Sequence, residues 1–80
     1  MYVYILRSKQ DHCFYVGSAN DVEKRVNQHN KGYSKSTTLK RPWELVRVEK
    51  FENSLLALKR EKFLKTGKGR LVLKNICSLE

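Results

Sequence analysis

The chain lacks long hydrophobic runs, and this shortage argues against a membrane or exported protein. No apolar segment among its 80 residues approaches the roughly 20 residues that a membrane-spanning helix requires. The opening residues, MYVYIL, are too few for the apolar core of a signal peptide, and they are neither preceded by a basic segment nor followed by a small-residue cleavage site. We therefore expect a water-soluble protein that works in the cytoplasm.

Cysteine is scarce as well. The two cysteines, Cys13 and Cys77, form neither a C-x-x-C pair nor a disulfide framework. His12 lies next to Cys13 without the spacing of a zinc site, which would need both cysteines and both histidines of the chain to converge. We predict that both cysteines are small buried hydrophobic residues in a reducing compartment.

Acidic residues are outnumbered. The chain has 8 Asp and Glu against 17 Lys and Arg, so its formal net charge is +9. On so small a surface this excess produces a positive field that attracts polyanions. Nucleic acid is the partner that we expect. The simpler alternative is that the lysines only keep the protein soluble. The basic residues are dispersed and do not gather beside one amphipathic segment, which disfavours a membrane surface.

The N-terminal part of the chain predicts an antiparallel hairpin. Residues 2–7 and 13–18 are rich in β-branched and aromatic residues, and a polar connector joins them. Period-two alternation allows Tyr4 and Tyr15 to share one face of the resulting sheet. Residues 1–80 are near the lower size at which one hydrophobic core suffices, so we expect a single domain.

A third strand is expected over residues 43–51, where apolar and polar residues alternate. Strict alternation would place on one face Trp43, Leu45, Arg47, Glu49 and Phe51. Residues 32–42 contain Gly, Ser, Thr and Pro without periodicity and are expected to form a basic loop.

The first of two predicted helices lies near residues 21–31. Asn20 with Glu23 resembles a capping box, so we place the N-cap at Asn20, and Gly32 can end the helix in the left-handed conformation. Arg25 flanks the apolar stripe of this helix, which consists of Val22, Val26 and His29.

The second helix lies near residues 54–66, capped by Asn53 or Ser54, with Glu61 beside its apolar stripe. The stripe consists of Leu56, Ala57, Phe63 and Leu64. Arg60 falls near the middle of the stripe, which makes sense only if its stem packs and its head reaches solvent.

Gly67 and Gly69 are expected to interrupt the second helix, and residues 70–79 suit either a short third helix or a strand. The predicted fold is therefore α/β, of the α+β type. It has a small three-stranded, mainly antiparallel sheet flanked by two or three helices.

Several chemically active residues stand in a particular order along these elements. YVY covers Tyr2–Tyr4, YVG covers Tyr15–Gly17, and the two helices carry Arg25, His29 and Glu61. This ordered combination resembles the GIY-YIG nuclease domain over residues 2–66, in the form of a small stand-alone member. The first motif departs from the family pattern, since Tyr2 replaces its glycine and Val3 its isoleucine. The tyrosine either crowds the site or points to another face.

The resemblance implies metal-dependent hydrolysis of phosphodiester bonds in nucleic acid. In such a site Tyr4 is the preferred base for the attacking water, and Tyr15 positions the phosphate. Arg25 stabilises the transition state, and His29 assists proton transfer or orients a tyrosine. Glu61 holds one Mg²⁺ or Mn²⁺, which a single protein ligand binds weakly without substrate.

Each of these residues also has an ordinary structural interpretation. Tyr4 and Tyr15 suit cross-strand neighbours, and Gly17 suits a turn as well as a close approach to a ligand. Glu61 forms an i, i+4 ion pair with Lys65 on a helix, and Arg25 has the same relation to Asp21. Two other functions therefore stay open. One is a non-catalytic nucleic-acid-binding module that retains the fold, and the other is a small basic subunit of a larger complex.

Nucleic-acid contacts are expected at the basic loop, at the C-terminal basic segment and at the second motif. The residues concerned are Gly17, Lys35, Lys40, Arg41, Lys65, Lys68 and Arg70. We expect DNA ahead of RNA, and a protein partner that supplies target specificity, because so short a chain has little surface for base readout.

Overall fold

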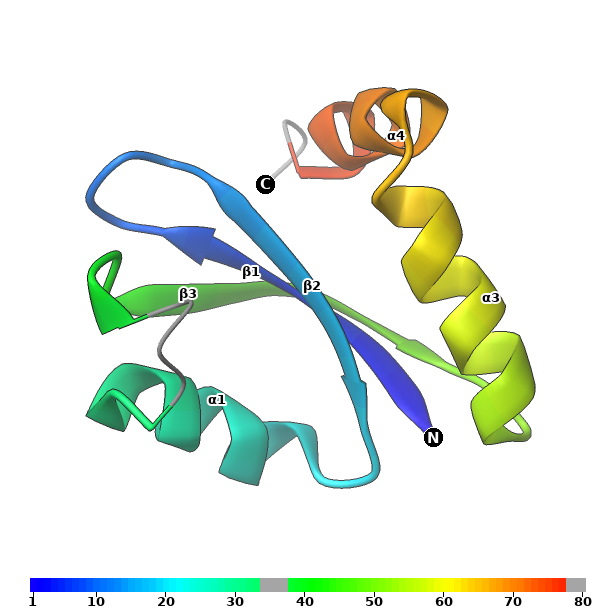
Figure 1. The fold of residues 1–80 in the computed structure, drawn as a ribbon, viewed down its shortest axis with the longest axis horizontal. Coiled ribbons are helices and arrows are strands. Elements are labelled where there is room, and N and C mark those ends of the chain that lie inside the picture. The colour runs from blue at the N-terminus through cyan, green and yellow to red at the C-terminus, as the bar shows by residue number, and fades with distance from the viewer. Residues whose placement is uncertain (34–37, 78–80) are drawn as a thin grey trace.

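The structure, a computed structural model, describes residues 1–33 and 38–77. Its elements are, in order, β1 (Tyr2–Ser8), β2 (Phe14–Ala19), α1 (Val22–Lys31), β3 (Trp43–Lys50), α3 (Ser54–Leu64) and α4 (Gly67–Cys77). The sheet has the order β2-β1-β3 with both pairings antiparallel. One face carries α1, and the other carries α3 and α4 (Figure 1). The predicted α+β fold is therefore confirmed.

β1 is the central strand, so its two faces belong to two separate hydrophobic clusters. Val3 and Ile5 pack toward α3 and α4, whereas Tyr4 and Leu6 pack toward α1. Tyr15 of β2 joins the cluster on the α1 side, which confirms that the two tyrosines share a face. Within the part of the chain that the structure describes, no helix is long and apolar enough to cross a membrane.

β3 does not keep the strict alternation that its sequence predicts. Its pairing with β1 slips by one residue between Ile5 and Leu6, which is a β-bulge. The extra residue moves every later side chain of β3 to the opposite face. The prediction of one common face for the odd-numbered residues is therefore wrong. Trp43 packs on the α1 side, whereas Glu49 lies opposite Val3 on the α3 side.

The bulge explains Arg60, which the sequence places in the apolar stripe of α3. Arg60 donates from Nε to Oε1 of Glu49 at 2.8 Å and from Nη2 to Oε2 at 3.1 Å. Its guanidinium also lies 5.6 Å from the ring centroid of Phe63. The guanidinium of Arg60 was expected to extend into solvent. Instead, it forms a bidentate pair with Glu49 that joins α3 to β3.

The first residues of α1 follow β2 after a short turn. The N-cap is Asp21, whose side chain accepts a hydrogen bond from the backbone N–H of Lys24 at 3.0 Å. The prediction of Asn20 as the cap is wrong, because Asn20 serves as the turn residue and Asp21 has the extended backbone of a cap. The predicted end is confirmed, since Gly32 is left-handed with φ of 84°.

α3 buries a narrower stripe than its sequence predicts. Asn53 is confirmed as the N-cap, accepting from the backbone N–H of Leu56 at 3.0 Å. Ala57 and Leu64, seven residues apart, are fully buried, whereas Leu56 and Phe63 are 42% and 39% exposed. Inclusion of the last two in the buried stripe is wrong. Only one line of α3 residues touches the sheet, because α3 packs as a single layer with solvent on its far side.

α4 begins at Gly67, so the alternative of a C-terminal strand is wrong. Both glycines lie in its first turn and do not merely interrupt α3. A Cβ on Gly69 would lie 1.9 Å from the carbonyl oxygen of Phe63 and 2.5 Å from Cα of Leu64. The backbones of α3 and α4 touch at this point, so only glycine allows this sharp junction.

Cys13 is exposed, so the prediction that it is a buried hydrophobic residue is wrong. It precedes β2, an edge strand, and therefore lies outside the sheet. The Nζ of Lys40 donates to its Sγ at 3.2 Å. The side chain of Cys77 lies outside the described part of the structure.

Candidate active site

Tyr4 stands at the centre of the candidate site. It has no exposed surface, and its hydroxyl lies 3.0 Å from Nε2 of His29, a buried residue of α1. The two residues are 25 positions apart in the chain. The packing of α1 on this face of the sheet brings them together.

Gly17 makes room for the Tyr4 ring. The two residues are paired across β2 and β1. A Cβ on Gly17 would lie 2.5 Å from the hydroxyl oxygen of Tyr4 and 2.7 Å from its Cζ. The close approach that the sequence suggests at Gly17 is therefore an approach of the Tyr4 ring, and any other residue would push that ring away from His29.

Tyr15 completes an aromatic cluster with Tyr4, His29 and Trp43. Its ring centroid lies 4.7 Å from that of His29, 6.1 Å from that of Trp43 and 6.3 Å from that of Tyr4. Tyr15 is half-buried, so it is the tyrosine of the pair with surface open to a substrate. Tyr2, which replaces the family's glycine, is half-buried at the end of β1 opposite Ala19.

α1 is fixed to β3 next to His29. The Nδ2 of Asn30 donates to the backbone carbonyl of Trp43 at 3.1 Å, and its Oδ1 accepts from the backbone N–H of the same residue at 2.6 Å. One side chain thus satisfies both backbone groups at the start of β3. This double hydrogen bond holds the imidazole of His29 at a set distance from Tyr4.

Burial and Arg25 control the charge of this cluster. Burial raises the pKa of Tyr4, although a hydrogen bond from Arg25 opposes the shift. Burial also lowers the pKa of His29, and the positive charge of Arg25 lowers it further. A neutral His29 can accept the Tyr4 hydroxyl proton at Nε2. Both members of the pair are therefore uncharged at neutral pH.

Arg25 is exposed on α1, one turn before His29. Its Nη1 donates to Oε1 of Gln28 at 3.1 Å. The alternative of a surface ion pair with Asp21 is not observed, because Asp21 caps the helix instead. A planar donor fork beside two tyrosines and open to solvent suits a phosphate group.

Glu61 lies on α3, on the other side of β2 from the aromatic cluster. Its Oε1 accepts from the hydroxyl of Ser18 at 2.8 Å, and its Oε2 pairs with Nζ of Lys65 at 2.8 Å. Burial raises the pKa of Glu61, but the hydrogen bonds from Lys65 and Ser18 outweigh it and leave the pKa below its usual value. The negative charge of Glu61 is also among the influences that raise the pKa of Tyr4. The carboxylate is therefore ionised and near the phenol.

The donor set at Glu61 suits one hard cation. An ionised carboxylate beside the Ser18 hydroxyl offers oxygen ligands, which Mg²⁺ and Mn²⁺ prefer, and a single protein carboxylate leaves most positions to water. Among residues 1–33 and 38–77, no group of three or more His, Cys, Asp or Glu side chains could hold a metal ion. The ammonium of Lys65 already contacts Oε2, so a cation at that oxygen would compete with it.

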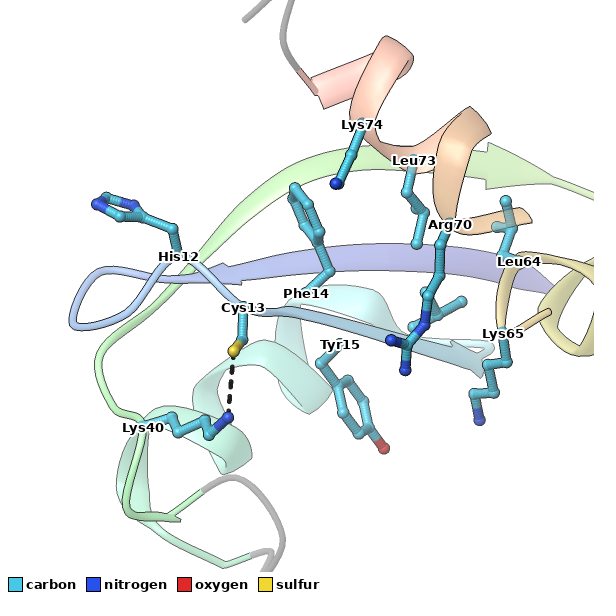
Figure 2. Close-up of a pocket in the computed structure, with 11 residues that line it drawn as sticks. His12, Cys13, Phe14, Tyr15, Lys40, Leu64, Lys65, Arg70, Leu73 and Lys74 are labelled. Atoms are coloured by element: carbon cyan, nitrogen blue, oxygen red, sulfur yellow. Dashed lines mark hydrogen bonds between the residues drawn. The ribbon is translucent and has the colours of Figure 1, made fainter. Parts of the chain in front are cut away.

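Three of the residues predicted to contact nucleic acid lie around the same cavity. Lys40, Lys65 and Arg70 line one cavity of about 490 Å³ beside Tyr15 (Figure 2). Arg41 turns away and donates from Nε to the carbonyl of Thr38 at 2.8 Å. Lys68 is exposed but does not line this cavity. Lys35 lies outside the described residues.

Three residues of this region were not expected from the sequence. Ser18 directly follows the second motif and orients Glu61, and Trp43 packs against Tyr15. Lys74 lines the same cavity as Arg70 and follows it by four residues in the chain. Only Lys74 left a signal in the sequence, namely the i, i+4 spacing on a C-terminal helix.

Comparison with known protein families identifies the family to which this chain belongs. The family of the GIY-YIG catalytic domain matches residues 1–75. The chain belongs to the GIY-YIG family. This is a nuclease family, so the domain implies nucleic-acid binding, and its members generally use divalent metal ions.

Small proteins named UPF0213 resemble most of the chain. UPF0213 protein SSP2268 of Staphylococcus saprophyticus is 43% identical over 76 residues, covering 94% of this chain and 92% of its own length. UPF0213 protein SAV0488 of Staphylococcus aureus is 44% identical over 66 residues, which is 81% of this chain and 79% of that protein. The solution NMR structure of UPF0213 protein BH0048 from Bacillus halodurans has a TM-score of 0.57 at 31% identity, with 94% of this chain and 82% of that chain covered.

Proposed function

We propose that residues 1–80 act as one domain, a metal-dependent endonuclease that hydrolyses phosphodiester bonds, with DNA ahead of RNA as the substrate. The observation that supports this most is the arrangement around Gly17. A phenol paired with a neutral imidazole lies beside an exposed arginine and an ionised glutamate. Packing alone requires none of these polar groups.

Tyr4 and His29 act together as the base in this proposal. A raised pKa makes tyrosinate rare at neutral pH, so a neutral Tyr4 has to pass its proton on. As the attacking water gives a proton to the Tyr4 oxygen, the Tyr4 hydroxyl proton moves to Nε2 of His29, 3.0 Å away. Because Tyr4 is fully buried in the free protein, a local opening has to admit the water, and we place it beside Gly17, which adds no side chain of its own next to the phenol.

Arg25 and Tyr15 hold the phosphate. The guanidinium of Arg25 matches two non-bridging oxygens, and it lies where negative charge grows as the water attacks. The half-buried phenol of Tyr15 donates a hydrogen bond to the same group. Glu61, together with waters, would hold Mg²⁺ or Mn²⁺, which would supply Lewis acidity for the phosphate and the leaving oxygen.

Glu61→Gln tests the metal-dependent reaction. This change keeps the shape and the hydrogen-bond acceptor for Ser18 but removes the charge that attracts the cation. We expect cleavage to fall by at least about two orders of magnitude, whereas binding of the same oligonucleotide persists or tightens, because a repulsive charge is lost. The assay uses single-stranded, duplex, nicked and branched DNA as well as RNA, with Mg²⁺ or Mn²⁺. Glu52→Gln, the same change at an exposed glutamate after β3, is the matched control and should cut normally.

Arg25→Lys tests charge stabilisation on the same substrates. Lysine keeps the positive charge but not the planar donor fork, so we expect binding within a few-fold of the parent and turnover lower by about two orders of magnitude. Arg47→Lys, at an exposed position of β3, is its control. If both site variants fold and cut at the parent's rate, the proposal is wrong.

A non-catalytic nucleic-acid-binding module is the second candidate. Two observations favour it, namely the complete burial of Tyr4 and the ion pair that Lys65 forms with Glu61. No cleavage of any substrate in the panel with either metal, combined with tight binding, would establish this function in place of the first.

A further inference from the structure

The cavity beside Tyr15 lies at the free edge of the sheet, between β2 and α4. Its volume of about 490 Å³ falls within the range of about 300–1,000 Å³ that is typical of ligand sites. β2 is an edge strand, and its first residues form one wall (Figure 2). Tyr15 and Lys65 belong to this cavity and also border the candidate active site. Whatever binds here therefore lies next to the candidate active site.

The floor of the cavity is apolar. It consists of Phe14, Val16, Leu64 and Leu73, contributed by β2, α3 and α4. Phe14 is half-buried and points toward α4, whereas Tyr15 leaves β2 in another direction (Figure 2). An apolar floor with an aromatic ring at the edge offers a surface on which a flat heterocycle can stack.

The rim of the cavity is cationic throughout. It carries Lys40, Lys65, Arg70 and Lys74, and no Asp or Glu among residues 1–33 and 38–77 lines it. Lys40 and Lys65 already pair with Asp11 and Glu61, respectively. Arg70 and Lys74, four residues apart on α4, form no side-chain hydrogen bond or ion pair with the described residues. These two charges are available for an anionic ligand.

We propose that this cavity binds an unpaired nucleobase of the substrate, while Arg70 and Lys74 hold the phosphates that flank it. The apolar floor suits the face of a base and the cationic rim suits the backbone, which is the combination that single-stranded nucleic acid requires. A base within a duplex cannot enter unless it leaves its stack. This inference rests on the proposed function, because it assigns the nucleotide next to the cleaved bond to a single-stranded segment.

The test compares a base-bearing strand with a base-free one. Fluorescence anisotropy, with EDTA present to prevent cleavage, measures the binding of a labelled oligothymidine and of an abasic strand of equal length. Both carry the same number of phosphates, so electrostatics cancel. We expect the parent protein to bind oligothymidine about tenfold more tightly. Equal affinities would overturn the proposal, and this comparison requires no variant.

Two variants separate the floor from the rim. Phe14→Leu keeps an apolar side chain but removes the ring, so the preference for oligothymidine should fall several-fold while binding of the abasic strand is unchanged. Lys74→Gln should weaken binding of both strands equally. Lys50→Gln is its control, because Lys50 lies at the far end of β3, the opposite edge strand. An equal weakening of both strands by Lys50→Gln would contradict the assignment to this cavity.

Other outcomes separate this inference from the proposed function. If the parent cuts nucleic acid but binds both strands equally, the cavity does not hold a base and the nuclease proposal stands. If it prefers the base-bearing strand but cuts nothing, the cavity assignment stands for a binding module. If polyglutamate displaces oligothymidine at equal concentration, the cavity takes an acidic protein segment and the inference is wrong.

Discussion

At the scale of single residues, the missing side chain of Gly17 matters to this site as much as the side chains that are present. Gly17 contributes no side chain, and the Tyr4 ring occupies the space. Tyr4 in turn reaches a histidine that burial keeps uncharged. The hydroxyl proton therefore has a defined acceptor, which a phenol facing solvent would lack.

His29 predicts how stability depends on pH. Burial, together with the charge of Arg25, lowers the pKa of His29 below 6.5, so as pH falls the unfolded chain takes up this proton first. The stabilisation is complete above about pH 6.5 and is lost as pH falls toward the folded pKa. Urea denaturation between about pH 8 and pH 5 should therefore show declining stability in the parent.

His29→Gln should flatten this decline, because the variant has no proton to gain at that position. His12→Gln removes the other, exposed histidine and should leave the decline in place. A parent protein equally stable at both ends of this pH range would contradict the assignment of a buried neutral imidazole.

Among the elements, β3 contains a bulge and α4 follows α3 through a sharp junction. Both features help to position the residues of the site and of the cavity. The bulge in β3 turns Glu49 toward α3, where it binds Arg60 and fixes the helix that carries Glu61. The sharp junction between α3 and α4 brings Arg70 to the cavity at the edge of β2.

The α3–α4 junction predicts opposite effects for two neighbouring glycines. Gly69→Ala adds a methyl group against the backbone of Phe63 and Leu64, so it should cost about 1–3 kcal/mol of unfolding free energy. Gly67→Ala adds the same group where no atom lies within 4 Å, and should be neutral or stabilise by up to about 1 kcal/mol. Urea denaturation of both variants measures the difference. Equal stabilities would mean that the two backbones are not in contact.

For the whole molecule, the charge of +9 predicts electrostatic binding. Affinity for an arbitrary oligonucleotide should fall steeply between low and physiological salt, because each phosphate contact releases counterions. Arg70→Gln should reduce the slope of log affinity against log salt by about one unit, whereas Lys50→Gln should leave it unchanged. An affinity that does not change with salt would point to a partner other than nucleic acid.

The sequence by itself determined the three strands, the helices α1 and α3, the antiparallel pairing of the hairpin and the order of the site residues. These features follow from local patterns, namely period-two alternation in β1 and β2, a helical stripe in α1 and the ordered motifs that resemble the GIY-YIG domain. Each depends on residues close together in the chain, so their periodicity is visible without knowledge of the partners.

Only the tertiary structure decided the features that depend on distant partners. The bulge opposite Ile5 and Leu6, the approach of Tyr4 to Gly17, and the hydrogen bond from Ser18 to Glu61 all join separate segments. The cavity is a further case, since residues of β2, α3 and α4 form it together with Lys40. Register and helix placement set these contacts, and a shift of one residue moves every later side chain of a strand to the other face.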